Sequence, residues 1–179
     1  EVESRHFVDG TVYEVIDPIA DVRRAPAPDA ALDTQALFGE RVTVYETTDE
    51  GWAWGQLASD NYVGWLPANA LATPGDAATH RVIVPRTLCF PGPDIKLPPL
   101  AALPLGATVA IARQEGRFAV AQNGWHLPAG HVAPLAATYR DFVAVAEMLL
   151  GAPYLWGGKS VLGIDCSGLT QNTLLARGT

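Results

Sequence analysis

The stretches GAPYLWGG (residues 151–158) and GIDCSGL (residues 163–169) decide how the C-terminal part of this sequence folds. They place one cysteine, Cys166, directly after a glycine-rich turn and at the expected start of a helix. The unpaired amides and the positive dipole end of a helix N-terminus favour the thiolate, which is the nucleophilic form of cysteine. Ser167 and Gly168 are small, so a bulky substrate can approach. The pattern predicts a nucleophile at Cys166, whereas a lone cysteine without such flanks is usually a buried core residue.

A helix is predicted on the N-terminal side of this turn. Thr138 and Asp141 have the spacing of a capping box, in which a hydroxyl and a carboxylate bond to free amides of the first turn. Gly151 and Pro153 are expected to end the helix. The apolar residues that recur at helical spacing are Phe142, Val145, Ala146 and Leu149.

A second helix is predicted to begin near Cys166 and to close at Gly178. Leu169, Leu174 and Leu175 would lie along it.

Short strands dominate the first part of the sequence. Turn residues such as Asp49-Glu50-Gly51 and Ser59-Asp60-Asn61 separate them. Short strands joined by close turns favour a small barrel. The predicted strands are 11–16, 41–45, 52–57 and 62–66.

Residues 81–135 repeat this pattern more loosely, after a linker at Thr73–Asp76. Three segments of the first part match three of the second: 38–44 with 105–111, Glu50-Gly51-Trp52 with Glu115-Gly116-Arg117, and Leu66-Pro67-Ala68 with Leu127-Pro128-Ala129. The sequence therefore predicts an α+β protein of three parts, with boundaries at 1–75, 76–136 and 137–179.

Composition excludes several classes of partner. The chain has 179 residues, 49% of them hydrophobic, a net charge of −7 and a pI of about 4.9. This acidic balance argues against nucleic acid and against anionic membrane surfaces. No run of eighteen apolar residues is present, so no membrane helix is predicted. With no signal segment we expect a cytoplasmic protein, or a periplasmic or secreted one if a signal has been removed before Glu1.

Two cysteines, Cys89 and Cys166, make no disulfide scaffold. Cys89 lies between Leu88 and Phe90 and is interpreted as a buried thiol. No pair of Cys or His residues has the spacing of zinc ligands, so a zinc site is disfavoured. A thiol nucleophile at Cys166 would need neither a metal nor an organic cofactor.

These motifs resemble the NlpC/p60 cysteine peptidases, which have a compact papain-like fold and act on bacterial cell-wall peptides. Gly-x-Pro-Tyr-x-Trp-Gly-Gly and Asp-Cys-Ser-Gly stand at the family's spacing. The two β-rich parts resemble tandem bacterial SH3 modules. Segments 32–40 and 62–65 are similar to the first module of the γ-D-glutamyl-L-diamino acid endopeptidases, which trim cell-wall peptides with a free N-terminal L-alanine.

The resemblance implies a role for five residues. Cys166 would be the nucleophile, and the hydroxyl of Tyr154 would lie near the developing oxyanion. Asp165 would hold the α-ammonium of the substrate, while Tyr62 and Asp33 would close the same amine pocket. The family has a glutamate where this chain has Asp33. Carboxylates that face one ammonium would suit a site that accepts only a free N-terminus.

Each of these residues also has an ordinary structural reading. Asp165 can be a helix N-cap, Asp33 a solvated loop acid, and Tyr62 an ordinary strand aromatic. Tyr154 can simply pin its loop. Two neighbours, Trp156 and Ser167, are interpreted as a packing residue and a backbone-capping residue.

No catalytic base is apparent. All four histidines, His6, His80, His126 and His131, precede Cys166 and are interpreted as structural or surface residues. The resemblance places the base on a strand well after the cysteine. We therefore expect the sheet that carries it to lie beyond Thr179 or on another chain, the 179 residues alone to hydrolyse nothing, and the helix pair to expose one apolar face.

The sequence thus predicts, for the complete enzyme, hydrolysis of the γ-D-glutamyl–diamino acid bond in peptides such as L-Ala-γ-D-Glu-diaminopimelate. Attack by Cys166 would give a thioester that water hydrolyses. Two alternatives remain open. One is a peptidoglycan-binding module with an inactive peptidase part, and the other is a related thiol amidase or acyltransferase.

Overall fold

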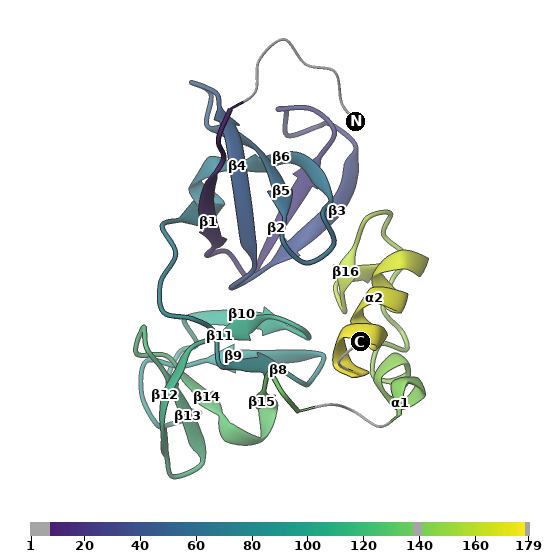
Figure 1. The fold of residues 1–179 in the computed structure, drawn as a ribbon. Helices are drawn as coiled ribbons and strands as arrows, with labels where there is room; N and C mark the ends of the chain where they lie inside the picture. The colour runs from purple at the N-terminus through teal and green to yellow at the C-terminus, as the bar shows by residue number, and fades with distance from the viewer. Residues whose placement is uncertain (1–7, 138–140, 178–179) are drawn as a thin grey trace.

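The computed structural model describes residues 8–137 and 141–177. The fold of these residues is mostly β, with the α-helices gathered near the C-terminal end (Figure 1). The predicted α+β class is thus dominated by its β part. Within the described residues, no helix is both long and apolar enough to cross a membrane.

The first β unit is one curled antiparallel sheet of seven strands, in the order β3-β2-β6-β5-β4-β1-β7. Its core is formed by small and branched residues that alternate along the strands, such as Val42, Val44 and Leu57. The strands are β1 (Thr11–Val15), β2 (Ile19–Arg23), β3 (Leu32–Leu37), β4 (Arg41–Thr47), β5 (Trp52–Leu57), β6 (Val63–Pro67) and β7 (Leu71–Ala72).

The four strands predicted in this unit all form, each within two residues of its predicted ends. Sequence reasoning did not identify β2, β3 and β7 as strands. β3 carries Asp33, Thr34 and Gln35, whose polar side chains hide the alternation that marks a strand. Pairing with β2 holds β3 in place, from Ile19 opposite Leu37 to Arg23 opposite Leu32.

The second β unit contains three small sheets, in the orders β10-β9, β11-β8-β15 and β12-β13-β14. Its core includes Leu103, Leu127 and the fully buried Cys89. The strands are β8 (His80–Val82), β9 (Arg86–Cys89), β10 (Ala101–Pro104), β11 (Thr108–Val109), β12 (Ile111–Glu115), β13 (Phe118–Ala121), β14 (His126–Pro128) and β15 (Val132–Pro134).

The predicted internal repeat is confirmed at its turns. Gly39 and Gly106 have φ of 82° and 89°, and Gly51 and Gly116 have φ of 85° and 57°. These left-handed conformations favour glycine because a Cβ atom would be strained there. Each unit also has a short 3₁₀ turn after a proline, at Ala68–Ala70 and Ala129–His131.

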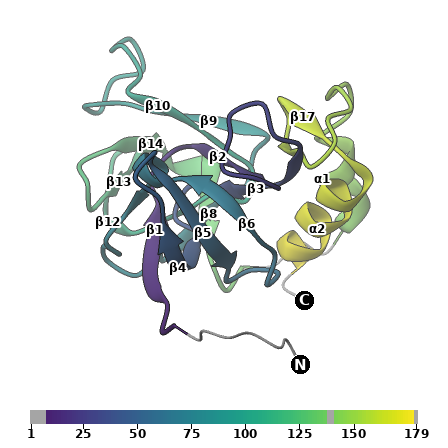
Figure 2. The ribbon, with the colours of Figure 1, turned by 90° about the horizontal axis from the view of Figure 1, so that it is seen from above.

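The remaining segment, 141–177, contains two helices and a small hairpin. These are α1 (Phe142–Glu147), β16 (Lys159–Ser160), β17 (Gly163–Ile164) and α2 (Cys166–Arg177). Val145 and Leu149 pack with Ile164 and with Leu105 of the second β unit. Figures 1 and 2 both show the hairpin and α2 beside β3, at the edge of the first sheet.

The start of α1 differs from the predicted capping box. Asp141 is itself the N-cap, in an extended conformation, and accepts hydrogen bonds from the amides of Val143 and Ala144. Aspartate is among the strongest N-cap residues, which explains why the helix begins here. Thr138 lies outside the described residues.

The end of α1 also differs from the prediction. The helix ends at Glu147, well before Gly151, because its last turn tightens. The amides of Leu149 and Leu150 bond to carbonyls three residues back, at Ala146 and Glu147.

Candidate active site

Cys166 is the first residue of α2, as the sequence predicts, and its thiol is free and exposed. Cys89 is also free but buried, and burial raises the pKa of its thiol to about 12. A thiol with such a pKa remains protonated at neutral pH and is a poor nucleophile. The two cysteines therefore differ sharply in what they can do, and Cys89 is the buried thiol that its sequence neighbours predict.

The turn before Cys166 is held by close backbone contacts. β16 pairs with β17, with Lys159 opposite Ile164 and Ser160 opposite Gly163. A Cβ atom on Gly168, in the first turn of α2, would collide with the carbonyl oxygen of Gly158. Only glycine lets the helix lie against the hairpin at this distance, so the glycines of the motif set where Cys166 emerges.

Asp165 is buried, and both oxygens of its carboxylate accept hydrogen bonds. One oxygen accepts hydrogen bonds from the Ser167 hydroxyl and the Gly168 amide, both 2.7 Å long, and the other accepts from the Gly157 amide at 2.8 Å. Burial alone would raise the pKa of this carboxyl, but these hydrogen bonds outweigh burial and hold the pKa below its ordinary value. Asp165 thus caps α2 and ties it to the glycine turn.

Ser167 differs from its prediction as a backbone-capping residue. Its hydroxyl donates to the Asp165 carboxylate, because that charged acceptor is closer and stronger than a carbonyl.

Asp33 lies in β3 and is paired with Arg24. Oδ1 of Asp33 is 2.7 Å from Nη2 of Arg24, and Oδ2 is 3.4 Å from Nε. The aspartate side chain is 13% exposed and the arginine side chain 70% exposed. Asp33 is therefore a shielded strand residue, which contradicts the reading as a solvated loop acid.

The glycine turn brings Asp33 close to the Cys166 segment. A Cβ atom built on Gly157 would lie 3.0 Å from the Asp33 carbonyl carbon. The amide of Gly157 donates to the Asp165 carboxylate, so one glycine lies between the backbone of Asp33 and the side chain of Asp165. The left-handed conformation of Gly157, with φ of 76°, permits this approach.

Arg24 is a component that sequence reasoning missed. Its pKa is raised, first by the hydrogen bond to Asp33, then by the charge of Asp33, and to a smaller degree by Tyr62. The guanidinium therefore lies within electrostatic reach of both predicted pocket residues of the first β unit. The sequence signal was slight: an Arg23-Arg24 pair in an acidic chain.

Tyr62 and Tyr154 both present exposed rings, 43% and 69% exposed. The amide of Tyr62 donates to Oδ1 of Asp60 at 3.0 Å, which fixes the turn that carries the ring. Tyr154 forms an isolated bridge with Ile164, two residues before Cys166.

Trp156 is 65% exposed, so its prediction as a packing residue is wrong. Trp156 directly precedes Gly157 and Gly158 of the glycine turn and is not part of the apolar cluster of this segment.

The described histidines all have partners within the second β unit. Their Nδ1 atoms lie 2.8 Å from the Thr79 hydroxyl for His80, 3.1 Å from the Gly124 carbonyl for His126, and 2.9 Å from the Thr87 hydroxyl for His131. These contacts confirm the structural reading of the three. His6 lies outside the described residues.

A cleft of about 320 Å³ opens where the three parts of the molecule meet. Phe38, Leu105 and Leu174 form part of its apolar wall, and Asp60 and Lys159 also line it. Cys166 is not among its lining residues, so the cleft is separate from the candidate active site.

Apolar side chains are exposed around the helices and the glycine turn. The strongly exposed residues are Phe142, Val143, Leu150, Tyr154, Trp156 and Leu162. This agrees with the expectation that the helical segment exposes an apolar face.

Two protein families match the chain, one in the first β unit and one in the segment that contains Cys166. Residues 22–71 match the bacterial dipeptidyl-peptidase SH3 domain, and residues 151–179 match the NlpC/P60 family. Among solved structures, the fold is similar to an NlpC/P60 family protein from Bacillus cereus, with a TM-score of 0.75 and 18% sequence identity over 94% of this chain and 73% of that one.

Three curated proteins are similar in sequence. A gamma-D-glutamyl-L-lysine dipeptidyl-peptidase of Bacillus subtilis is 30% identical over 88% of this chain and 57% of its own length. A protein of the same name from Bacillus cereus is 28% identical over 82% and 51%. Dipeptidyl-peptidase 6 of Lysinibacillus sphaericus is 27% identical over 92% and 69%.

The chain thus spans 57% and 51% of the lengths of the first two relatives. Within that span, the two family matches lie at residues 22–71 and 151–179.

Proposed function

We propose that this chain contributes the nucleophile and the amine pocket of a cysteine peptidase that cleaves the γ-D-glutamyl–diamino acid bond of cell-wall peptides with a free N-terminal L-alanine. The observation that carries the proposal is the exposed Cys166 at the first residue of α2, within the NlpC/P60 segment. The named activity of the Bacillus relatives supports the choice of substrate.

The chemistry begins with attack of the Cys166 thiolate on the γ-carbonyl carbon of D-glutamate. A sulfur–carbon bond forms, and the carbonyl oxygen becomes an oxyanion, for which the Tyr154 hydroxyl is the proposed donor. The carbon–nitrogen bond then breaks, and the diamino acid leaves as an amine after taking up a proton. Water hydrolyses the thioester, which returns the thiol and releases the L-Ala-γ-D-Glu product.

Proton transfer in these steps needs a general base, and the resemblance to the family assigns this role to a histidine. His80, His126 and His131 are bonded within the second β unit. We therefore propose that the 179 residues alone do not turn over substrate. Reactivity of the Cys166 thiol and binding of a peptide in the amine pocket are the functions that this chain can show by itself.

The amine pocket is proposed to consist of Asp33, Tyr62 and Asp165. Gly157 lies against the Asp33 backbone and binds the Asp165 carboxylate, and this adjacency of the two segments supports the proposal of one pocket. Arg24 already neutralises Asp33, so the substrate ammonium would compete with the guanidinium for that carboxylate. An acetylated N-terminus has no charge to compete with, and such a peptide should not bind.

The finer architecture belongs to the same proposal. We infer two SH3-like modules, at 1–75 and 76–136, followed from residue 137 by the first part of a papain-like domain. The repeated turns of the two β units support this division.

Alkylation of Cys166 by iodoacetamide, followed by mass spectrometry, tests the proposal without requiring turnover. Cys89 is buried and serves as an internal unreactive thiol. We expect L-Ala-γ-D-Glu-L-Lys to slow alkylation of Cys166 and the N-acetylated peptide to have no effect. Equal protection by the two peptides would refute the amine pocket. No protection by either would refute the peptide substrate itself.

A further inference from the structure

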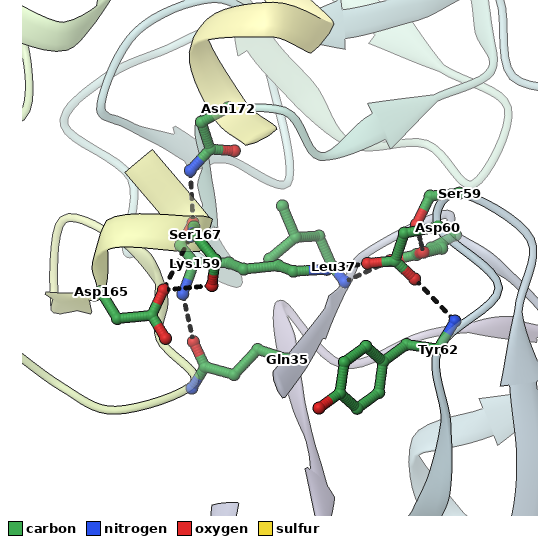
Figure 3. A network of polar contacts seen from close by, with 11 residues as sticks. Gln35, Leu37, Ser59, Asp60, Tyr62, Lys159, Asp165, Ser167 and Asn172 are labelled. Atoms are coloured by element: carbon green, nitrogen blue, oxygen red, sulfur yellow. Dashed lines mark hydrogen bonds and ion pairs between the residues drawn. The ribbon is translucent and has the colours of Figure 1, made fainter. Parts of the chain in front are cut away.

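Lys159 joins the Cys166 segment to the first β unit at several atoms. Its ammonium Nζ lies 2.9 Å from Oδ2 of Asp60, and its backbone amide donates to Oε1 of Gln35 at 3.0 Å. Its carbonyl accepts from the Asn172 side chain of α2 at 2.9 Å. Figure 3 shows Lys159 extended between these partners, with its ammonium beside Asp60.

Asp60 connects this lysine to Tyr62. While Oδ2 binds the ammonium of Lys159, Oδ1 accepts the amide hydrogen of Tyr62 at 3.0 Å. Rotation of the carboxylate would lengthen both bonds. The position of the Tyr62 turn is therefore linked to the position of Lys159.

Lys159 is in turn linked to the nucleophile. In the β16–β17 hairpin it lies opposite Ile164, two residues before Cys166. Gly157, two residues before Lys159, donates its amide to Asp165. A short series of direct contacts thus runs from Tyr62 through Asp60 and Lys159 to the turn that presents Cys166.

The contacts of Lys159 with Gln35 and Asp60 are polar, which distinguishes them from ordinary core packing. The apolar cluster around α1 contains Leu105 of the second β unit but no residue of the first. The side chains of Lys159 and Asp60 are only 10% and 19% exposed. A shielded ion pair contributes little net stability compared with apolar packing, but it fixes geometry because both charges must remain paired.

We propose that Asp60 and Lys159 are positioning residues, whose ion pair sets Tyr62 relative to Cys166 and so determines how the ammonium end of a peptide is bound. This inference rests on the proposed function. It assigns no contact between either residue and the reacting atoms.

Two substitutions remove the ion pair while keeping the other contacts. Lys159→Met retains the backbone bonds to Gln35 and Asn172. Asp60→Asn retains an oxygen for the Tyr62 amide. The double variant removes both members of the ion pair, so neither partner is left as an unpaired charge, and it remains informative if a single variant is poorly folded. Burial raises the pKa of Glu40 and the charge of Lys159 partly offsets this, and Glu40 loses that cation in Lys159→Met and in the double variant alike. The matched control is Glu14→Gln, which breaks the 2.9 Å pair with Arg41 inside the first β unit.

Protection of Cys166 from iodoacetamide by L-Ala-γ-D-Glu-L-Lys gives the first measurement. We expect each single variant to bind the peptide about 10-fold more weakly, and the double variant to be no weaker than the singles, since one link is lost in all three. The alkylation rate without peptide should change less than about twofold, which a general loss of structure would not allow. Glu14→Gln should match the wild type, and Lys159→Arg, which keeps the charge, should recover part of the affinity.

Additive losses in the double variant, or unchanged affinity in both single variants, would overturn the proposal. A second measurement applies if the wild-type chain binds no peptide, an outcome that refutes the proposed function instead. Hydrogen exchange at the Tyr62 amide should then accelerate about 10-fold in Lys159→Met and not in Glu14→Gln. Unchanged exchange in Lys159→Met would refute the positioning role independently of any substrate.

Discussion

The two β units have turns of the same kind but contribute different principal contacts to the Cys166 segment. The second unit inserts an apolar side chain, Leu105, into the cluster around α1. The first unit meets the same segment through Gln35 and Asp60, both of which bind Lys159. Burial of apolar side chains stabilises a contact but does not fix one orientation of its partners. Hydrogen-bonded charges fix the orientation of their partners but add little net stability. The second unit thus anchors the segment by apolar packing, and the first unit has the positioning role proposed above.

The largest effect on stability is expected from removing the apolar contact of Leu105 with the cluster around α1. Leu105 is 3% exposed, and Leu105→Ala should lower the free energy of unfolding by about 2 to 5 kcal/mol, because it removes buried methyl groups and leaves a cavity. Urea denaturation followed by tryptophan fluorescence measures this loss.

The control for this variant is Leu88→Ala in β9, where the side chain is 40% exposed. It should cost less than about 1 kcal/mol. An equal loss in the two variants would mean that Leu105 has no special anchoring role.

A smaller effect is expected at the cap of α2. Asp165→Asn should lower the free energy of unfolding by about 1 to 3 kcal/mol at neutral pH, because charge-assisted hydrogen bonds from Gly157, Ser167 and Gly168 are weakened. The pKa of Asp165 is lower in the folded state than its ordinary value of 3.8. Its contribution is therefore complete above pH 3.8 and is lost as the pH falls through the folded pKa.

Denaturation of wild type and Asp165→Asn at a series of pH values checks this sign. The difference between them should be constant near neutral pH and shrink in acid. A difference that grows in acid would contradict the hydrogen-bonded carboxylate.

The smallest effect is expected at the exposed face of the first unit. Arg24→Gln should lower the unfolding midpoint only slightly, because the arginine side chain is 70% exposed, although the Asp33 side chain that loses its cation is 13% exposed. If Asp33 receives the substrate ammonium, removal of its competitor should tighten binding of L-Ala-γ-D-Glu-L-Lys about threefold. The Cys166 protection experiment measures this change, and weaker binding would show instead that Arg24 contacts the peptide.

Local patterns predicted much of the secondary structure. The start of α2 at Cys166, the strands β1, β4, β5 and β6, and the repeated glycine turns all follow from short-range features. Prediction failed where polar residues occupy a strand, as in β3, whose order comes from pairing with β2. It failed again at Trp156, because exposure depends on what surrounds a side chain and not on its own polarity.

The candidate site divides in the same way. The local pattern predicts a nucleophile at Cys166, and the family resemblance adds Tyr154 and Asp165, all within one segment. They gave no indication of the bond between Lys159 and Asp60, which are 99 residues apart in sequence.

By itself, then, the sequence determined which cysteine begins a helix and the turn that presents it, because glycine conformations, capping and helical spacing depend on neighbours along the chain. The tertiary structure alone decided which cation neutralises Asp33 and which residues connect Tyr62 to the Cys166 turn. The physical reason is that a shielded charge is paired with whatever partner the fold brings within about 3 Å, and that distance has no counterpart in local sequence.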